Sequence, residues 1–318
     1  MGHTLLAVDT LPPYGAGRWR VLRGLMSRTN ELVDWRRANH KLLAGVRSFR
    51  PDLVWVDKGL LIRPWVLQRV RGLYPLVSLV HYSPDDMMNP FNQSKLYLAS
   101  IPVYHLHVTT KSYNVKELKE IGARHVMFVD NAFDESVHFP RELSSAEMAE
   151  YKCCVGFVGG FEAERFATMQ YLARNGVDVV FRCPDWSHFK RRYEVTKGLT
   201  VIERWYVEDD YAKVVSATKV NLGFLRKCNR DRQTQRSVEI PACGGFMLAE
   251  RTNEHLGLFK EGEEAEFFDS GNELLQKARF YLENPNARES VAQHGYQRCL
   301  QSGYGNQCRL RMIIEEIP

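Results

Sequence analysis

Short runs of apolar and β-branched residues alternate with longer amphipathic stretches along most of the chain. Such runs predict buried strands of parallel sheets with helices between them. The predicted strands of the first half are residues 4–8, 53–56, 75–80, 104–108 and 126–129. Those of the second half are residues 154–158, 178–181, 200–203, 220–224, 245–249 and 265–268. Two series of this length predict an α/β protein with two similar lobes.

The two series are separated by residues 131–151, which are polar, contain a proline and have no clean period. A segment of this kind is typical of an interdomain linker. A chain of 318 residues is also longer than one core usually holds. We therefore expect a first domain over residues 1–140 and a second over 141–318, with the last helix packing back on the first lobe.

Helix signals are clearest near the C-terminal end. Ser270 and Glu273 form a capping-box pattern ahead of apolar residues at helical spacing. Asn284 and Pro285 should end that helix, and another helical stretch is expected from about Ala287.

Composition narrows the class of protein. Hydrophobic residues make up 44% of the chain and charged residues 25%, which is typical of a globular protein. No run of 18 apolar residues and no signal-peptide pattern occurs, so a cytoplasmic protein is expected. The seven cysteines include no C-x-x-C pair, which argues against a disulfide framework and against a zinc site.

Charge is unevenly distributed along the chain. The net charge is +5, yet residues 1–50 carry nine arginines and lysines against three acidic residues. The basic residues between 18 and 50 are suited to attract an anionic partner, which could be a phosphorylated substrate, the inner face of a membrane or a nucleic acid. A solvated helix face without a partner explains the same pattern.

A glycine turn follows the first predicted strand of the second lobe. In VGFVGGFEAER, residues 155–165, Gly159 and Gly160 end an apolar strand and precede a helix-compatible run. At this place in a doubly wound sheet, glycines let a ligand approach the amides of a helix N-terminus. The spacing differs from G-x-G-x-x-G, so both a ligand loop and a tight packing turn fit.

The densest cluster of charged residues lies between 224 and 245. Arg226 and Lys227 follow a predicted strand and are suited to clamp a diphosphate, because charge-assisted bonds to phosphate oxygens are strong. Glu239, further along, is suited to accept bonds from the vicinal hydroxyls of a ribose. Arg236 has two explanations: it contacts ligand, or it braces Glu239 or Asp231. The alternative for the whole segment is a solvated basic loop beside a packed turn.

The same residues carry a resemblance. YKCCVGFVGGFEAER, RQTQRSVEIPACGGFMLAE and the segment from FKEGEEAEFF to YQRCL occur in an order that resembles the C-terminal lobe of the CgeB-like (spore maturation protein) glycosyltransferases, over roughly residues 145–310. DTLPPYGAGRWRVLRGL, PDLVWVDKG and HYSPDD are similar to the other lobe of that family. The resemblance implies the GT-B fold, with two Rossmann-like lobes facing each other across a cleft.

The resemblance also implies site residues. In retaining GT-B enzymes a Glu-x7-Glu motif places its second glutamate on the donor ribose, and Glu239 holds that position. Asp231 stands at the first, where its shorter side chain departs from the pattern. Arg165 corresponds to the basic residue after the glycine loop. The remaining pair, Gly244 and Gly245, would let the backbone approach the phosphates.

The implied reaction moves a hexose-type sugar from a UDP- or GDP-type donor to an acceptor that is a glycan, a lipid-linked sugar, a protein or a small molecule. No cofactor needs to be tightly bound. The chain has no Asp-x-Asp triplet, and basic groups can stabilise the departing diphosphate, so a metal-independent enzyme is expected. The acceptor hydroxyl needs a general base, for which His81, Asp85 and Asp86 are the candidates. Capping of a turn is the alternative role for the two aspartates.

Three other functions fit parts of the sequence. A noncatalytic nucleotide- or sugar-binding protein would keep the donor pocket and tolerate Asp231. An oxidoreductase would use the glycine turn, with Arg182 in place of the usual ribose-binding acid and therefore NADP as its cofactor. A nucleic-acid protein would use the basic N-terminal region with Trp19 and Trp35, but no recognised binding module accompanies them, so no nucleic-acid partner is expected.

Overall fold

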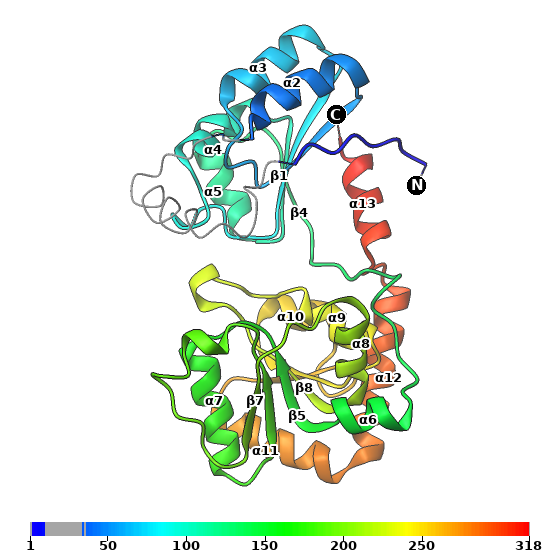
Figure 1. Ribbon diagram of the computed structural model, residues 1–318. Coiled ribbons are helices and arrows are strands. Elements are labelled where there is room, and N and C mark those ends of the chain that lie inside the picture. Colours follow the sequence, from blue (N-terminus) through cyan, green and yellow to red (C-terminus); the bar gives the residue numbers. More distant parts are fainter. Residues whose placement is uncertain (1, 10–33, 35, 318) are drawn as a thin grey trace. The chain divides into compact units, whose positions relative to one another are not determined.

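The structure of the protein, a computed structural model, describes residues 2–9, 34 and 36–317 (Figure 1). The chain forms two compact units: unit 1 comprises Met1–Asp130 and Leu310–Pro318, and unit 2 comprises Asn131–Arg309. Much of the basic region 18–50, with Trp19 and Trp35, lies outside the described residues. No helix in the described ranges is both long and apolar enough to cross a bilayer.

Unit 1 holds a parallel sheet of four strands in the order β1-β2-β3-β4. The strands are β1 (Leu53–Asp57), β2 (Ser78–Ser83), β3 (Leu106–Thr109) and β4 (Val126–Phe128). The helices are α2 (Ala38–Phe49), α3 (Pro64–Leu73), α4 (Lys95–Ser100), the 3-10 turn η1 (Ile101–Val103) and α5 (Asn114–Glu120). Helices α2 and α3 share one apolar cluster beneath them, which includes Leu42, Val46, Val66 and Val70.

Two strand predictions for unit 1 need correction. Residues 4–8 do not form a strand. Strand β2 begins later than predicted, because Pro75 and Leu76 belong to the turn after α3, where the Leu76 side chain is 96% exposed. The strand instead continues through His81 and Ser83, whose polar side chains are buried. Hydrophobicity alone misplaced the strand because its second half is polar and still internal.

Unit 2 holds a parallel sheet of six strands in the order β10-β9-β8-β5-β6-β7. The strands are β5 (Cys153–Val158), β6 (Val179–Arg182), β7 (Leu199–Ile202), β8 (Thr218–Gly223), β9 (Met247–Glu250) and β10 (Glu266–Phe268). The helices are α6 (Ser145–Tyr151), α7 (Ala163–Arg174), α8 (Glu208–Ala217), α9 (Arg236–Ala242), α10 (Asn253–Leu258), α11 (Gly271–Glu283) and α12 (Pro285–Gln301), with 3-10 turns η2 (Trp186–His188) and η3 (Lys227–Asn229). Both parallel sheets confirm the predicted α/β class.

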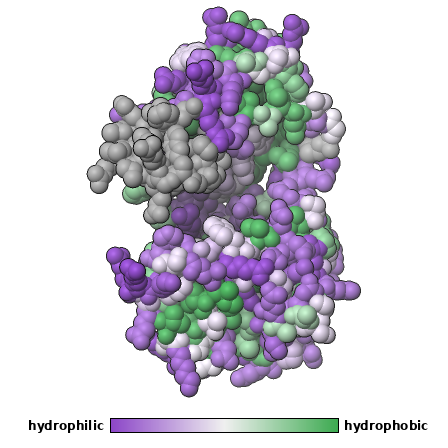
Figure 2. Space-filling view, viewed as in Figure 1, coloured by the Kyte–Doolittle hydropathy of each residue, from purple (hydrophilic) through white to green (hydrophobic). Residues whose placement is uncertain are grey.

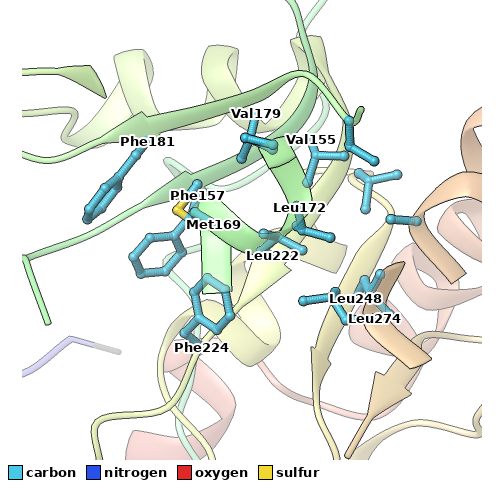
Figure 3. Packing of buried hydrophobic residues seen from close by; sticks show 14 of the residues in the cluster. Val155, Phe157, Met169, Leu172, Val179, Phe181, Leu222, Phe224, Leu248 and Leu274 are labelled. Carbon is cyan, nitrogen blue, oxygen red and sulfur yellow. The ribbon is translucent and has the colours of Figure 1, made fainter. Parts of the chain in front are cut away.

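One apolar cluster of unit 2 lies between its sheet and helices α7 and α11, and a second includes residues of helices α8 and α9. Side chains of Val155, Val179 and Leu222 extend from the strands towards Met169 and Leu172 of α7 (Figure 3). Strands buried on both faces read as nearly continuous apolar runs, which is why the sequence located them well. This rigid sheet positions the loops at its two edges.

Local signals explain the ends of several helices. Ser270 caps α11 by accepting a hydrogen bond from the Glu273 N–H at 3.2 Å. Pro285 begins α12, because a proline at the first helical position lacks only an N–H that would be unpaired there. Residues 131–151 belong to unit 2 and end in α6, whose first turn is closed by a capping box between Ser144 and Glu147.

The chain returns to unit 1 at its end. Helix α13 (Asn306–Glu315) carries Ile313, which is 2% exposed and packs in one apolar cluster with Val80, Leu106 and Val108 of strands β2 and β3. The segment after Arg309 therefore contributes to the core of unit 1, whose other residues all precede Asn131.

Candidate functional site

The carboxyl edge of the unit 2 sheet contains a topological switch point. From β5 the sheet extends through β6 to β7 on one side and through β8 to β9 and β10 on the other. The loops after β5 and β8 therefore leave in opposite directions and open a crevice, which is where ligands of doubly wound sheets bind. The Gly159–Gly160 turn follows β5, and Arg226 and Lys227 follow β8.

The glycine turn is fixed by its neighbours. A Cβ on Gly159 would lie 2.6 Å from the Phe157 ring, so any larger residue there would have to displace that ring. Asp185, in the loop after β6, accepts a hydrogen bond of 3.1 Å from the Phe161 N–H. The N-cap residue of α7, Glu162, makes no side-chain capping bond. The turn therefore presents the N-terminus of a 12-residue helix to the crevice, an arrangement that favours anions.

Two arginines from distant parts of the sequence meet at Glu162. The Arg165 Nη2 atom lies 3.6 Å from Glu162 Oε1, and the Arg226 Nε atom lies 3.4 Å from the same oxygen. Arg165 is only 9% exposed and also donates to the Gly160 carbonyl at 3.2 Å. Burial lowers the pKa of Arg165, the Glu162 carboxylate opposes that shift, and the neighbouring Arg226 adds to it. The structure thus brings together two of the predicted phosphate-binding cations.

Lys227 joins the same edge through Glu250, the last residue of β9. Glu250 pairs with the Lys227 ammonium group, and its other oxygen accepts a 2.8 Å bond from the Leu225 N–H. One carboxylate therefore holds both the backbone and the cation of the loop after β8. Glu250 is not among the residues predicted for the site, although an acid that directly follows the apolar run FMLA is a signal for one.

Asp231 shapes this loop. Its carboxylate accepts bonds from the Asn229 side chain at 2.7 Å and from the Arg226 N–H at 3.4 Å. Its own N–H donates to the Arg226 carbonyl at 3.2 Å. These contacts close residues 226–231 into a compact turn. The carboxylate of Asp231, the first acidic residue of the expected Glu-x7-Glu motif, is therefore bonded to groups of its own loop.

Glu239 lies in the first turn of α9 and is 5% exposed. It pairs with Arg236, whose guanidinium carbon lies 4.1 Å from the centre of the Tyr211 ring. His138 Nε2 lies 3.7 Å from the other carboxylate oxygen. Burial lowers the pKa of His138, although the Glu239 carboxylate opposes that shift. The structure therefore pairs Arg236 with Glu239, one of the two arrangements expected for it, and adds His138, which no sequence signal indicated.

Gly244 and Gly245 lie at the opposite edge of the sheet from Arg226. They form the turn between the end of α9 and the start of β9, at the amino ends of the strands. A Cβ on Gly245 would lie 2.5 Å from Val215 and 2.9 Å from the Asn221 side chain. Close packing explains this glycine, and the structure does not bring the pair to the crevice where the phosphates were expected.

Arg182 ends β6, yet its side chain is 1% exposed. Its Nη2 group donates to the Tyr151 carbonyl at 2.6 Å, and its Nη1 atom lies 3.5 Å from Cys153 Sγ. The guanidinium group therefore points back into the core. This orientation removes the cation on which the NADP hypothesis relied.

In unit 1, the three candidate bases lie in different surroundings. His81 is 1% exposed, and its Nε2 group donates to the Lys58 carbonyl at 3.0 Å. Asp86 is fully buried and accepts bonds from the Met88 N–H at 3.1 Å and from the Asn114 side chain at 2.9 Å. Asp85 keeps a side-chain exposure of 21% and pairs with Lys58. Of the three, only Asp85 is accessible to an acceptor.

Comparison with known proteins agrees with this architecture. Residues 165–315 match the family model described as glycosyl transferase-like. Sucrose-phosphate synthase from Thermosynechococcus elongatus shares the fold with a TM-score of 0.61 and 11% identity, over 89% of this chain and 79% of that chain. Anabaena Alr3699/HepE in complex with UDP-glucose does so with a TM-score of 0.62 and 13% identity, over 93% and 88%. No curated protein matches the sequence.

These similarities identify the fold as GT-B. The α,α-trehalose 6-phosphate synthase of Burkholderia multivorans has the same fold, with a TM-score of 0.56 and 11% identity over 92% of this chain and 79% of that chain. The second half of the chain is glycosyltransferase-like in sequence as well, because the family match extends from α7 to α13.

Proposed function

We propose that this protein is a glycosyltransferase that uses a nucleoside-diphosphate sugar, with UDP as the nucleotide. The main support is that Arg165 and Arg226 both contact Glu162. Glu162 stands at the N-terminus of α7, at the switch point of the unit 2 sheet. Anabaena Alr3699/HepE, which has a similar fold, forms complexes with UDP-glucose and with UDP, and this supports UDP for this chain. The motifs of the second half support a place in the CgeB-like family.

The diphosphate would replace Glu162 as the partner of the two arginines. As the bond between sugar and diphosphate breaks, negative charge develops on the departing UDP. Arg165, Arg226 and the α7 amides would stabilise that charge, with Lys227 next to them on the same loop. These groups supply positive charge without a metal ion, so we propose a metal-independent reaction.

For the acceptor, we propose Asp85 as the group that accepts the hydroxyl proton. Its carboxylate is the most exposed of the three candidates, and Lys58 pairs with it, so a proton acceptor and a cation lie side by side there. We also propose retention at the sugar carbon, because Asp231 and Glu239 have the eight-residue spacing of the Glu-x7-Glu motif that they resemble in retaining GT-B enzymes. The engagement of both acids by protein groups supports the second candidate, a noncatalytic UDP-sugar-binding protein.

The test is calorimetric titration of the purified protein with UDP, GDP, uridine and UDP-glucose, in magnesium and in EDTA, followed by detection of released UDP with UDP-glucose and other UDP-sugars. We expect UDP to bind in both buffers and more tightly than uridine or GDP. UDP release would establish turnover, and binding without release for any sugar would favour the noncatalytic candidate. Absence of UDP binding by the folded protein would contradict both.

Replacement of Glu239 by alanine should have two effects. It leaves the half-buried Arg236 cation without its partner, which should lower the free energy of unfolding by about 2 kcal/mol, less than for a fully buried pair because the Arg236 side chain is 31% exposed. If Glu239 contacts the ribose, affinity for UDP should also fall about tenfold. Urea unfolding and calorimetry measure the two effects separately.

Glu266 offers a matched control for this prediction. It is 7% exposed and pairs with Lys277 and Tyr281, and it stands at the amino end of β10, at the far edge of the sheet. Glu266→Ala should lose similar stability and keep UDP affinity. Equal loss of affinity in both variants would mean that Glu239 acts only through stability.

A further inference from the structure

The helices α2 and α3 form a strongly basic part of unit 1. Residues 36–77 carry nine lysines and arginines and only two acidic residues, Asp52 and Asp57, whereas the whole chain has a net charge of +5. The rest of the chain is therefore slightly acidic. A charge difference of this kind orients a protein towards a partner of opposite sign.

Several of these cations have no carboxylate partner within the described residues. Lys41, Arg47 and Arg50 lie on or directly after α2, and Arg69 lies on α3, and all four are exposed without an ion pair to any described residue. In unit 2, by contrast, Arg165, Arg226 and Lys227 are each paired. The unpaired charges of α2 and α3 are thus available to an anionic partner.

Large apolar side chains are exposed among these cations. They are Phe49 at the end of α2, Trp65 and Leu73 of α3, and Leu76 in the turn that follows. Figure 2 shows hydrophilic and hydrophobic residues interleaved over this end of unit 1. We refer to the surface formed by Lys41, Arg47, Phe49, Arg50, Trp65, Arg69, Leu73 and Leu76 as the α2–α3 face.

The fold brings these side chains onto one surface. Helices α2 and α3 lie side by side (Figure 1) over a shared apolar cluster, so their outward positions form one layer. Each helix precedes a strand of the same parallel sheet, which puts both helix C-termini at the amino edge. Phe49 and Arg50 therefore share an end with Leu73 and Leu76. The Asp85 loop follows a strand and lies at the other edge.

We propose that the α2–α3 face binds the surface of an anionic lipid bilayer. Arginine and lysine heads are attracted by anionic headgroups, and leucine, phenylalanine and tryptophan side chains gain free energy by entering the boundary with the acyl chains. A nucleic acid would bind the cations and stack on the aromatic rings, but it has no apolar region in which Leu73 and Leu76 could be buried. Large apolar side chains that are grouped on one surface and surrounded by charged residues are typical of an interaction site. This proposal is independent of the transferase activity.

The test is co-sedimentation of the full chain with vesicles of neutral phosphatidylcholine and of phosphatidylcholine with phosphatidylglycerol, at low and high salt. We expect binding to the anionic vesicles at low salt only. Because each cation near such a surface contributes about 1 kcal/mol, the double variant Arg47→Gln/Arg69→Gln should bind about thirty-fold more weakly. Leu76→Ser should also bind more weakly, and it cannot disturb a core because Leu76 is exposed.

The matched control is Arg191→Gln/Lys197→Gln, which removes two exposed cations from unit 2. It should bind the anionic vesicles like the unchanged protein, and UDP affinity should be the same in all variants. The proposal is overturned by equal binding to neutral vesicles, by equal losses in both double variants or by no vesicle binding at all. Tighter binding to a single-stranded oligonucleotide than to vesicles would overturn it in favour of a nucleic acid.

Discussion

Replacing Arg165 or Arg226 by glutamine should weaken UDP binding by about ten- to a hundred-fold while leaving uridine binding unchanged. Each arginine would make charge-assisted bonds to the diphosphate, and such bonds contribute about 1.5–3 kcal/mol. Uridine lacks the phosphates and reports the base and ribose contacts alone. Calorimetric titration with UDP and uridine measures the difference directly.

The shared carboxylate makes this prediction sharper. Because both cations contact Glu162, the two substitutions should not be additive. Glu162→Gln removes the competing anion and should preserve or increase UDP affinity. Arg174→Gln, an exposed position in the last turn of α7, is the control for a change of charge on the same helix. A parallel loss of uridine affinity in the Arg165 variant would show damage to the fold and would contradict a diphosphate role.

The second large effect concerns the stability of unit 1 in acid. The rings of His81 and His107 lie 5.1 Å apart between their centres, with their planes tilted by 50°, beside Tyr97 and Tyr104. His107 is fully buried, and its Nε2 group donates to the Ile101 carbonyl at 2.9 Å. Burial lowers the pKa of His81 to about 3, with His107 adding to the shift, and lowers that of His107 to about 4. Both rings are therefore neutral in the folded protein near neutral pH.

These shifts fix the sign of the pH dependence. The pKa of each ring is lower in the folded chain than in the unfolded chain, where it is about 6.5, so the unfolded chain takes up more protons as the pH falls. The stabilising contribution is complete above pH 6.5 and declines below it. At pH 5 each histidine should have lowered the free energy of unfolding by about 2 kcal/mol.

Hydrogen exchange of peptides covering β1 and β2, compared at pH 7 and pH 5 after correction for intrinsic rates, measures this loss within unit 1. The double variant His81→Gln/His107→Gln keeps an amide donor near each carbonyl and should flatten the pH dependence. His294→Gln, an exposed position in α12, should leave it unchanged. A pH response that survives the double variant would assign the acid sensitivity to other groups.

The sequence predicted the sheets better than the site. Strands β5 to β10 are buried apolar runs, and a pattern of hydrophobicity locates such runs directly. The predicted position of strand β2 was wrong because hydrophobicity predicts a buried Leu76 and an exposed His81. In the structure Leu76 is exposed and His81 is buried. Burial of a polar ring depends on partners such as the Lys58 carbonyl, and the local pattern carries no information about them.

Within the candidate site, the residues that could be predicted are those that follow the end of a predicted strand. Arg165 and Arg226 come together because both follow neighbouring strands of the predicted sheet. Glu162, which joins them, shows no pattern by itself. Arg236 and Glu239 could be paired from their three-residue spacing on a helix. His138 comes from a segment that looked like a linker, and only the folded chain brings it to Glu239.

The position of Ile313 has a consequence for biosynthesis. Chains emerge from the ribosome N-terminal end first, and domains generally fold as units during synthesis. Unit 2 is one continuous segment and can complete its core once residue 309 has emerged. Unit 1 is synthesised first, yet its cluster around Val80 and Leu106 lacks Ile313 until that residue has emerged, after the whole of unit 2. The half of the protein that is made first is therefore finished last.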